Sequence, residues 1–561
     1  MKMVRSLLLG SAAGFVAVAG AQAADMPVKA KPVEYVKICS LYGAGFYYLP
    51  GTDICIKWGA YVRFQVYEGA GSSPSNGPFI GASGQGTVFL NTPNDLVARS
   101  RNIFTMDART QTEYGTLRAY ILLGFSQDWP SNQSSANGAG ATLYATRGFI
   151  QFAGFTVGKA TSFYDIWSVP ANSYFAVWSS DTGDAGMLLA GYTFQFGNGF
   201  SATIAAEDPR KNTVVNTSIA SIGTIAAAQP VPFAGAVNPF TVGATANADQ
   251  AQVRWPDVVA NLRVDQAWGS FQVMGAVHDN TGGYFVPSVG VTCNVGALGG
   301  TLTGQLACGH PDDNIGFAVG AGGIFKVPMW TGLTDIASFQ VNYTNGASRY
   351  AVFTPTGAGS PNFFGTTGLL ACPSPGTPAN SGVNGLNTPT CLGQIGLGYW
   401  TDGIYANPGA LPFYNGNVQN TTVWGVNAAW DHLWTPNLKS SVYGSFISVE
   451  YNQTAADLIA IATCGIAGTA ANTLTRMTNV AKGGVCNPDF QVWQVGSRTQ
   501  WNITSSFYVG FDVMWQHLDT AFAGAAFYTA ATNLPRPSGN YEITNQDTVS
   551  FTARAHWDIL P

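Results

Sequence analysis

Apolar and polar residues alternate over long stretches of this 561-residue chain. Successive side chains of a β-strand point to opposite faces, so such alternation predicts a strand with one apolar and one polar face. An amphipathic strand of a soluble sandwich would show the same pattern. The length, the aromatic content and the repetition of the pattern favour a membrane barrel instead. It is clearest before Glu68, where two series alternate: Ile56, Trp58, Ala60, Val62, Phe64 and Val66 against Lys57, Gly59, Tyr61, Arg63, Gln65 and Tyr67.

The same pattern, bounded by residues typical of turns, predicts sixteen strands in all. Their expected ranges are 56–67, 99–111, 116–126, 143–152, 155–159, 187–196, 200–206, 258–266, 271–278, 314–327, 336–345, 421–430, 438–451, 490–503, 507–517 and 546–558.

Seven short turns alternate with eight longer loops between these strands. That arrangement is typical of an outer-membrane barrel with periplasmic turns and external loops. An even number of strands places both chain ends on the periplasmic side. The last strand also alternates, with Ser550, Thr552, Arg554 and His556 on its polar face. Pairing this strand with the 56–67 strand would close the ring. We therefore predict an all-β fold, a transmembrane antiparallel β-barrel of about 16 strands.

The composition agrees with this fold class. Only 10% of the residues are charged, 13% are aromatic, and the mean hydropathy is +0.10. Beyond the first 25 residues, no apolar run is long enough for a membrane helix. Several tryptophans lie near strand ends or on apolar series and suit the aromatic girdles of a barrel: Trp58, Trp268, Trp424, Trp430, Trp493, Trp501, Trp515 and Trp557.

The first 23 residues have the features of a secretory signal peptide. Lys2 and Arg5 precede an apolar core from Leu7 to Gly20, and Ala21-Gln22-Ala23 forms a small-residue cleavage site. Cleavage there moves the formal net charge from −5 to −7, because two positive charges are lost. A mildly acidic chain argues against nucleic-acid binding. We expect residues 24–53 to form an N-terminal periplasmic segment and residues 54–561 to form the barrel with its loops.

Eight cysteines fall as four pairs of sequence neighbours: Cys39 with Cys55, Cys293 with Cys308, Cys372 with Cys391, and Cys464 with Cys486. Disulfide bonds are the expected state in an exported chain. The neighbour pairing is a hypothesis, and pairing between non-neighbours remains open. Cysteine and histidine spacing gives no zinc site, and no cofactor or metal is predicted.

One segment carries a family resemblance. The run C-S-L-Y-G-A-G-F-Y-Y-L-P-G-T-D-I-C from Cys39 to Cys55, with K-W-G-A-Y-V-R after it, resembles the N-terminal signature of the alphaproteobacterial porins. Residues Ala24 to Lys37 resemble the mature N-terminus of the same family. The resemblance covers roughly the first tenth of the chain. It implies a homotrimeric diffusion channel in outer-membrane lipid that passes small hydrophilic solutes and ions, with a third loop folded inward.

The segment from Thr161 to Asp184 is the expected inward-folded loop. It is rich in aromatic residues, which would be poorly placed on a loop surrounded by water. It carries three acidic residues and no Lys or Arg, while the polar series of the first four strands offer Arg63, Arg101, Arg118 and Arg147. Opposed charges across a narrow gap would create a transverse field. The predicted constriction comprises Asp165, Asp181, Asp184, Arg63, Arg101, Arg118 and Arg147. The alternative is that the arginines solvate the lumen and the acids pair locally.

Three other functions remain open. A solute-specific channel would carry a ladder of aromatics along its lumen, whereas the lumenal series here hold scattered tyrosines. A barrel enzyme needs a catalytic set, and His278, His310, His432, His517 and His556 lie in no known catalytic motif. Such sets are recognised by geometry, so sequence alone leaves the enzyme open. An adhesin is suggested only by the bulk of the loops. We expect a channel and not an enzyme.

Overall fold

A computed structural model gives the fold of the chain. It describes residues 38–68, 96–129, 142–167, 172–175, 186–210, 214–217, 254–285, 309–329, 332–352, 361–371, 390–399, 401–408, 414–460, 487–528 and 539–560. The predicted signal peptide lies outside these residues.

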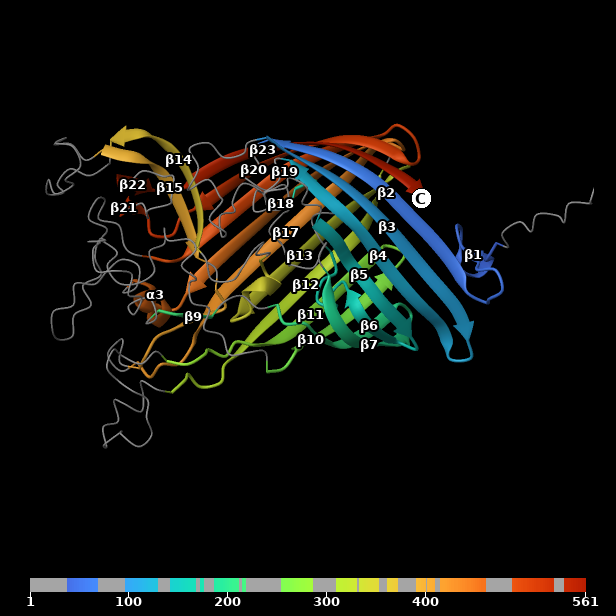
Figure 1. Cartoon of the computed structure of the whole chain (residues 1–561), viewed down its shortest axis with the longest axis horizontal. Helices are drawn as coiled ribbons and strands as arrows, with labels where there is room; N and C mark the ends of the chain where they lie inside the picture. Colours follow the sequence, from blue (N-terminus) through green and yellow to red (C-terminus); the bar gives the residue numbers. More distant parts are fainter. Residues whose placement is uncertain are drawn as a thin grey trace, which may run out of the picture.

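Sixteen of the described strands form a closed antiparallel ring (Figure 1). Each strand pairs with the next along the chain, and β2 pairs with β23 to close the ring. The ring strands are β2 (Cys55–Glu68), β3 (Leu96–Thr112), β4 (Gly115–Trp129), β5 (Thr142–Phe152), β6 (Phe155–Ala160), β7 (Met187–Gly197), β8 (Phe200–Glu207), β10 (Asp257–Gln266), β11 (Gly269–Asp279), β12 (Ile315–Pro328), β13 (Thr334–Asn345), β17 (Gln419–Thr435), β18 (Leu438–Tyr451), β19 (Phe490–Asn502), β20 (Phe507–Asp519) and β23 (Gln546–Leu560). The predicted fold class is confirmed, strand for strand.

Strand ends differ from the prediction by a few residues, most of all in β17, which continues past Trp430 to Thr435. Its last residues pair with the start of β18, so the ladder extends beyond the alternating segment. Hydropathy marks the part of a strand that crosses the lipid, whereas backbone pairing continues into water. The prediction therefore ends too early there.

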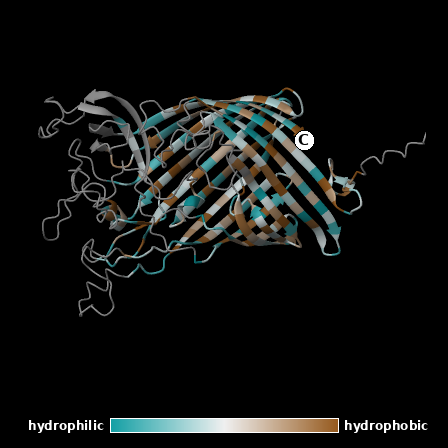
Figure 2. Ribbon diagram, in the orientation of Figure 1, coloured by the Kyte–Doolittle hydropathy of each residue, from teal (hydrophilic) through white to brown (hydrophobic). Residues whose placement is uncertain are grey.

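The polar series of the strands faces inward and the apolar series faces outward, which reverses the arrangement of a soluble protein. Phe64 and Val442 are 51% and 59% exposed on the outer face. Gln494 and Gln516, at neighbouring positions of β19 and β20, are fully buried on the inner face. Figure 2 shows the resulting alternation of hydrophobic and hydrophilic residues along the strands. Because lipid takes the place of water outside, exposing the apolar series carries no hydrophobic penalty.

The N-terminal segment is fastened to the first ring strand. Cys39 and Cys55 form a disulfide with a Cα–Cα distance of 5.9 Å, as predicted. The bond ties a 3-10 turn, η1 (Ser40–Tyr42), and the short strand β1 (Tyr47–Tyr48) to the start of β2. Figure 1 places β1 and the C-terminus at the same end of the barrel. The side chains of the other six cysteines lie outside the described residues, so their pairing stays a prediction.

The opposite end carries elements that the sequence analysis treats as loops. They include β9 (Val214–Asn216), η4 (Ser348–Tyr350), β16 (Gly403–Tyr405) and α3 (Gln453–Ala460). A separate four-stranded sheet joins β14 (Pro361–Ala371), β15 (Thr390–Tyr399), β22 (Gly539–Ile543) and β21 (Gly524–Tyr528), with β15 and β22 parallel. Among the described residues, no helix is long and apolar enough to cross a membrane.

A lysine on the outer face tests the orientation of the strands. Val442 of β18 pairs with Ser497 of β19, and Ser497 lies midway between Trp493 and Trp501. We expect V442K to destabilise the barrel by about 2–4 kcal/mol, the usual cost of a lysine at the bilayer midplane. The measurement is urea unfolding in lipid vesicles. Q491K, which lies on the outer side of Trp493, is the control and should have a much smaller effect. Equal effects of the two variants would contradict the assigned lipid belt.

Candidate functional site

The connection between β6 and β7 contacts the inner wall of the ring. The carbonyl oxygen of Phe163 accepts hydrogen bonds from Asn261 Nδ2 at 2.6 Å and Gln272 Nε2 at 3.0 Å. Farther along, the amide of Ile166 donates to Gln340 Oε1 at 3.3 Å. The three wall residues belong to the polar series of β10, β11 and β13. Residues 161–167 therefore lie against side chains that face the lumen.

Residues 172–175 of the same connection contact another part of the wall. The amide of Tyr174 donates to Asp512 Oδ2 at 2.6 Å, and the hydroxyl of Tyr443 donates to Asp512 Oδ1 at 2.7 Å. The ring of Tyr174 lies under two guanidinium groups, with Arg554 3.7 Å and Arg498 5.4 Å from its centroid. Cation–π contacts at such distances are attractive. The connection thus reaches from β10–β13 to β19, β20 and β23.

Glycines make room for this connection in the wall. A Cβ atom on Gly322 of β12 would lie 2.6 Å from Cγ2 of Ile166. A Cβ on Gly510 of β20 would lie 2.1 Å from the hydroxyl oxygen of Tyr174. Both separations are too short for non-bonded atoms. The ring therefore accepts the large side chains of the connection only because these wall positions have no side chain.

Asp165 forms a buried ion pair with Arg210, which follows β8. Arg210 Nη2 lies 2.8 Å from Asp165 Oδ2, and both side chains are almost fully buried. The guanidinium also packs 4.3 Å from the ring centroid of Tyr350. Burial alone would lower the pKa of Arg210, but Asp165, with Tyr350 and Glu207, raises it above its ordinary value. Asp165 is thus neutralised locally, as in the alternative that the sequence left open.

The predicted basic residues lie on neighbouring strands. Arg63 of β2 and Arg101 of β3 are direct cross-strand partners. Arg118 of β4 bonds to Asp107 at 2.9 Å, and Arg147 of β5 donates to the carbonyl of Thr146 at 2.7 Å.

Asp165 and the predicted arginines lie on opposite sides of the ring. In a ring of sixteen strands, β13 lies opposite β4, so Gln340, which also bonds Asp165, is across the lumen from this basic wall. Asp181 and Asp184 lie outside the described residues. The structure therefore leaves open whether these two acids face the arginines.

The prediction missed several residues that hold the connection. Arg498 and Asp512 lie on the polar series of β19 and β20, where alternation alone could have placed them in the lumen. Arg210 lies in a long external loop, and no sequence signal marks its partner 45 residues away. Its role depends on how the loops fold over the barrel.

One histidine lies within a buried acidic network. His278 Nδ1 is 2.7 Å from Asp257, and its Nε2 is 3.6 Å from Asp402. The hydroxyl of Ser348 donates to Asp402 and not to the imidazole, and this serine is fully buried. A nucleophilic serine needs a base within hydrogen-bond reach and access to substrate. This arrangement joins external loops and lacks the order of a catalytic triad. Among the described residues, no three His, Cys, Asp or Glu side chains lie close enough to hold a metal ion.

Removing the charge of Asp165 tests whether the ion pair holds the connection. D165N removes the carboxylate that bonds the buried Arg210 directly, and breaking a buried ion pair costs about 3–5 kcal/mol. We expect faster hydrogen–deuterium exchange of residues 161–167, with the ring strands still protected. D313N, which breaks an exposed pair with Arg254, is the control and should change nothing. Unchanged exchange in D165N would show that other contacts hold the segment.

Comparison with known proteins identifies the family. A family model described as the Porin subfamily matches residues 25–551. Porin Omp2b of Brucella melitensis biotype 1 is 35% identical over 221 residues, which cover 37% of this chain and 55% of that porin. Porin Omp2a of Brucella ovis is 35% identical over 223 residues, covering 36% and 59%. The chain thus spans little more than half the length of these relatives.

Solved structures of outer-membrane proteins also align. The outer membrane channel DcaP of Acinetobacter baumannii aligns with a TM-score of 0.49 and 13% identity, over 91% of this chain and 99% of that one. The family match extends over nearly the whole chain, and the ring presents an apolar outer face. This chain belongs to the Porin subfamily and is a multi-pass protein of the bacterial outer membrane.

Proposed function

We propose that the chain forms a water-filled channel through which small hydrophilic solutes and ions diffuse passively. The observation that carries this proposal is the closed sixteen-stranded ring with its polar series inside. Rings of 16–18 strands are wide enough for an aqueous channel, whereas rings of about eight fill with side chains. Membership of the Porin subfamily supports the same function.

We further propose that residues 161–184 fold into the lumen and narrow it. The contacts of Phe163 and Tyr174 with the wall support this arrangement, as do the glycines that accommodate Ile166 and Tyr174. Asp181 and Asp184 then supply the acidic side of the constriction. Arg63, Arg101, Arg118 and Arg147 line the basic side. Fixed charges on a low-dielectric wall focus potential across the gap, which favours polar over apolar solutes of equal size.

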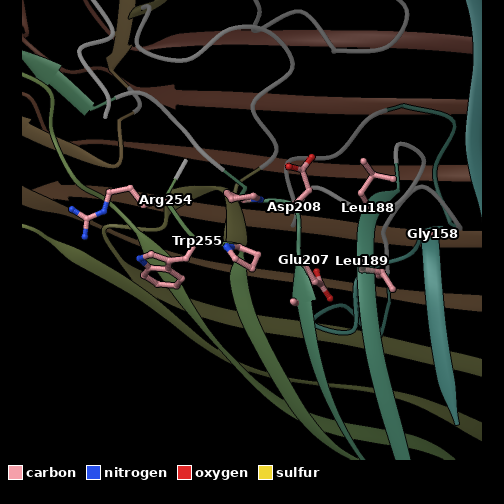
Figure 3. Close-up of a pocket in the computed structure, with 10 residues that line it drawn as sticks. Gly158, Leu188, Leu189, Glu207, Asp208, Arg254 and Trp255 are labelled. Atoms are coloured by element: carbon pink, nitrogen blue, oxygen red, sulfur yellow. The ribbon is translucent and has the colours of Figure 1, made fainter. Parts of the chain in front are cut away.

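The channel assembles as a homotrimer in this proposal, as the family resemblance implies. Strand β6 has six residues and β8 has eight, whereas a membrane-spanning strand takes about 9–11. Phe155, Leu188 and Ile204 are exposed on the outer face there. At the external end of these strands, Leu189, Asp208 and Trp255 help to line a notch of about 530 Å³ (Figure 3). Neighbouring subunits packed against β6–β8 would cover these short strands and their exposed apolar side chains.

Planar-bilayer recording tests the channel. The purified protein is expected to insert as stable, ohmic conductance steps, and a trimer closes in three equal substeps under high voltage. Detergent without protein is the blank, and heat-denatured protein is the matched control. Folded protein that inserts without conductance would rule out a diffusion channel and favour an adhesin or an enzyme.

Charge changes on the two sides of the constriction should shift ion selectivity in opposite directions. R63A removes a positive charge and should move the reversal potential in a salt gradient towards cation preference. D181N/D184N should move it towards anion preference. R254A, in an exposed loop pair, serves as the control with no expected shift. Two variants that both match the wild type would place the constriction elsewhere.

A further inference from the structure

Basic side chains gather where the first and last strands of the ring meet. His556 of β23 lies between Tyr508 of β20 and Arg63 of β2 in the cross-strand register, and Arg101 of β3 continues the row. Arg554, the next residue of β23 on the same face as His556, pairs with Gln65. All belong to the inward-facing polar series. Three arginines and a histidine thus share one patch of the inner wall, which we call the seam patch.

Like charges placed directly opposite each other destabilise an antiparallel pair. Arg63 and Arg101 are such a pair, and Arg554 lies diagonal to Arg63. Asp128, which lies nearby, holds Arg99 through bonds of 2.5 and 2.6 Å, and Nε of Arg101 donates to Ser126 Oγ at 2.9 Å. Asp558 accepts from His556 Nε2 at 3.0 Å, which anchors one side of the imidazole.

Three nitrogens of the seam patch are buried without a hydrogen-bond partner in the described part of the chain. They are Nε of Arg63, Nε of Arg554 and Nδ1 of His556. The two guanidinium N–H groups are donors, and leaving a buried donor unsatisfied is costly. In the imidazole tautomer that donates through Nε2, Nδ1 is an acceptor, so the donors offered to an anion are those of the arginines. The remaining parts of both arginines are half-buried at the lumen surface. A ligand that enters from the channel can therefore reach the accessible parts of Arg63 and Arg554.

Aromatic contacts hold the patch in place. The imidazole of His556 stacks on Tyr508 with centroids 4.7 Å apart and lies 4.6 Å from Tyr61. Arg63 lies 5.6 Å above the ring of Tyr61, and Arg554 lies 3.7 Å above Tyr174. Side chains fixed in this way lose little entropy when a ligand arrives, so the patch is preorganised.

We propose that the seam patch is a binding site for a small oxyanion, a carboxylate or phosphate group carried by a hydrophilic solute. Guanidinium groups match the geometry of these anions and bind them through paired, charge-assisted hydrogen bonds. Rings of Arg or Lys are also the usual lining of anion and phosphate pores. The proposal rests on the diffusion channel proposed above and gives that channel a preferred class of solute, anionic over cationic.

The competing source of counter-charge is the connection itself. Asp181 and Asp184 would neutralise the seam patch if they reached Arg63, and no oxyanion would then be needed. Neutralisation of the seam patch by a solute anion rises with the concentration of that anion, whereas neutralisation by a protein carboxylate does not. Measuring the chloride current as phosphate is added therefore distinguishes a bound solute anion from a protein carboxylate.

The test uses the full-length protein in planar bilayers with potassium chloride and inorganic phosphate as the probe. We expect phosphate to reduce the chloride current along a saturable curve and acetate to act more weakly. R63Q/R554Q should raise the half-blocking phosphate concentration about tenfold or more, as the loss of charge-assisted bonds predicts. R554K keeps the charge and should retain most of the effect.

Two controls separate the patch from the rest of the channel. R263Q removes an arginine that already pairs with Asp265 at 2.8 Å, and phosphate block should not change. Y174L keeps the basic residues and removes the ring under Arg554, so it should weaken the block less than R63Q/R554Q does. If Y174L abolishes block while R63Q/R554Q keeps it, the effect comes from the connection and the site is wrong.

The wild-type protein gives the remaining outcomes. A conducting channel that phosphate does not block overturns the oxyanion site and leaves the diffusion channel intact. If block then appears in D181N/D184N, the connection supplies the counter-charge in the native protein. Wild-type protein that inserts without conducting overturns the proposed channel itself.

Discussion

The whole structure depends on the need to pair every backbone N–H and C=O group that lies in hydrocarbon. No water is present there to satisfy an open sheet edge, so the sheet must close on itself. The pairing of β2 with β23 meets this need, with one register shift near Ala60. Closure also fixes which face of each strand meets lipid, because a slip of one residue would turn every side chain to the wrong side.

Closure creates a second problem, because a ring this wide cannot fill its interior with apolar side chains. The interior is instead held by polar contacts. The connection after β6 is bonded to wall residues as far apart as Gln272 and Asp512. Its anchors include a buried ion pair, Asp165 with Arg210, which contributes position more than net stability because both charges must leave water. These polar contacts thus fix the position of the connection inside the ring and add only modestly to the free energy of unfolding.

Much of this fold could be predicted from sequence because alternation is a local property. Each of the sixteen strands was found at its predicted place, and Cys39 and Cys55 were paired from their spacing in an exported chain. Strand ends were less accurate, since pairing in β17 continues where hydropathy no longer alternates. The parallel pairing of β15 with β22 joins segments about 150 residues apart in the sequence, and a periodic pattern carries no information on such contacts.

In the candidate site too, residues on strands could be placed from the sequence, whereas contacts made by loop residues could not. Arg63 and Arg101 could be assigned to the inner wall because each belongs to an alternating series. The partner of Asp165 could not, since Arg210 reaches it only after the external loops have folded over the ring. Charges on strands are therefore predictable in position, while the pairing of loop charges is not. An estimate of the lumenal field from sequence alone would count Asp165 as an open negative charge.

The two walls of the ring consequently differ in electrostatic character. On the side of β10–β13, Asp165 is matched by Arg210. On the side of β23, β2 and β3, like charges meet across the closing seam. Repulsion between these charges works against the strand pairing that the membrane requires. An anion bound there would relieve the repulsion and, by binding only the closed ring, would stabilise it in proportion to occupancy. If the seam patch binds an oxyanion as proposed, closure of the barrel and retention of anions depend on the same few side chains.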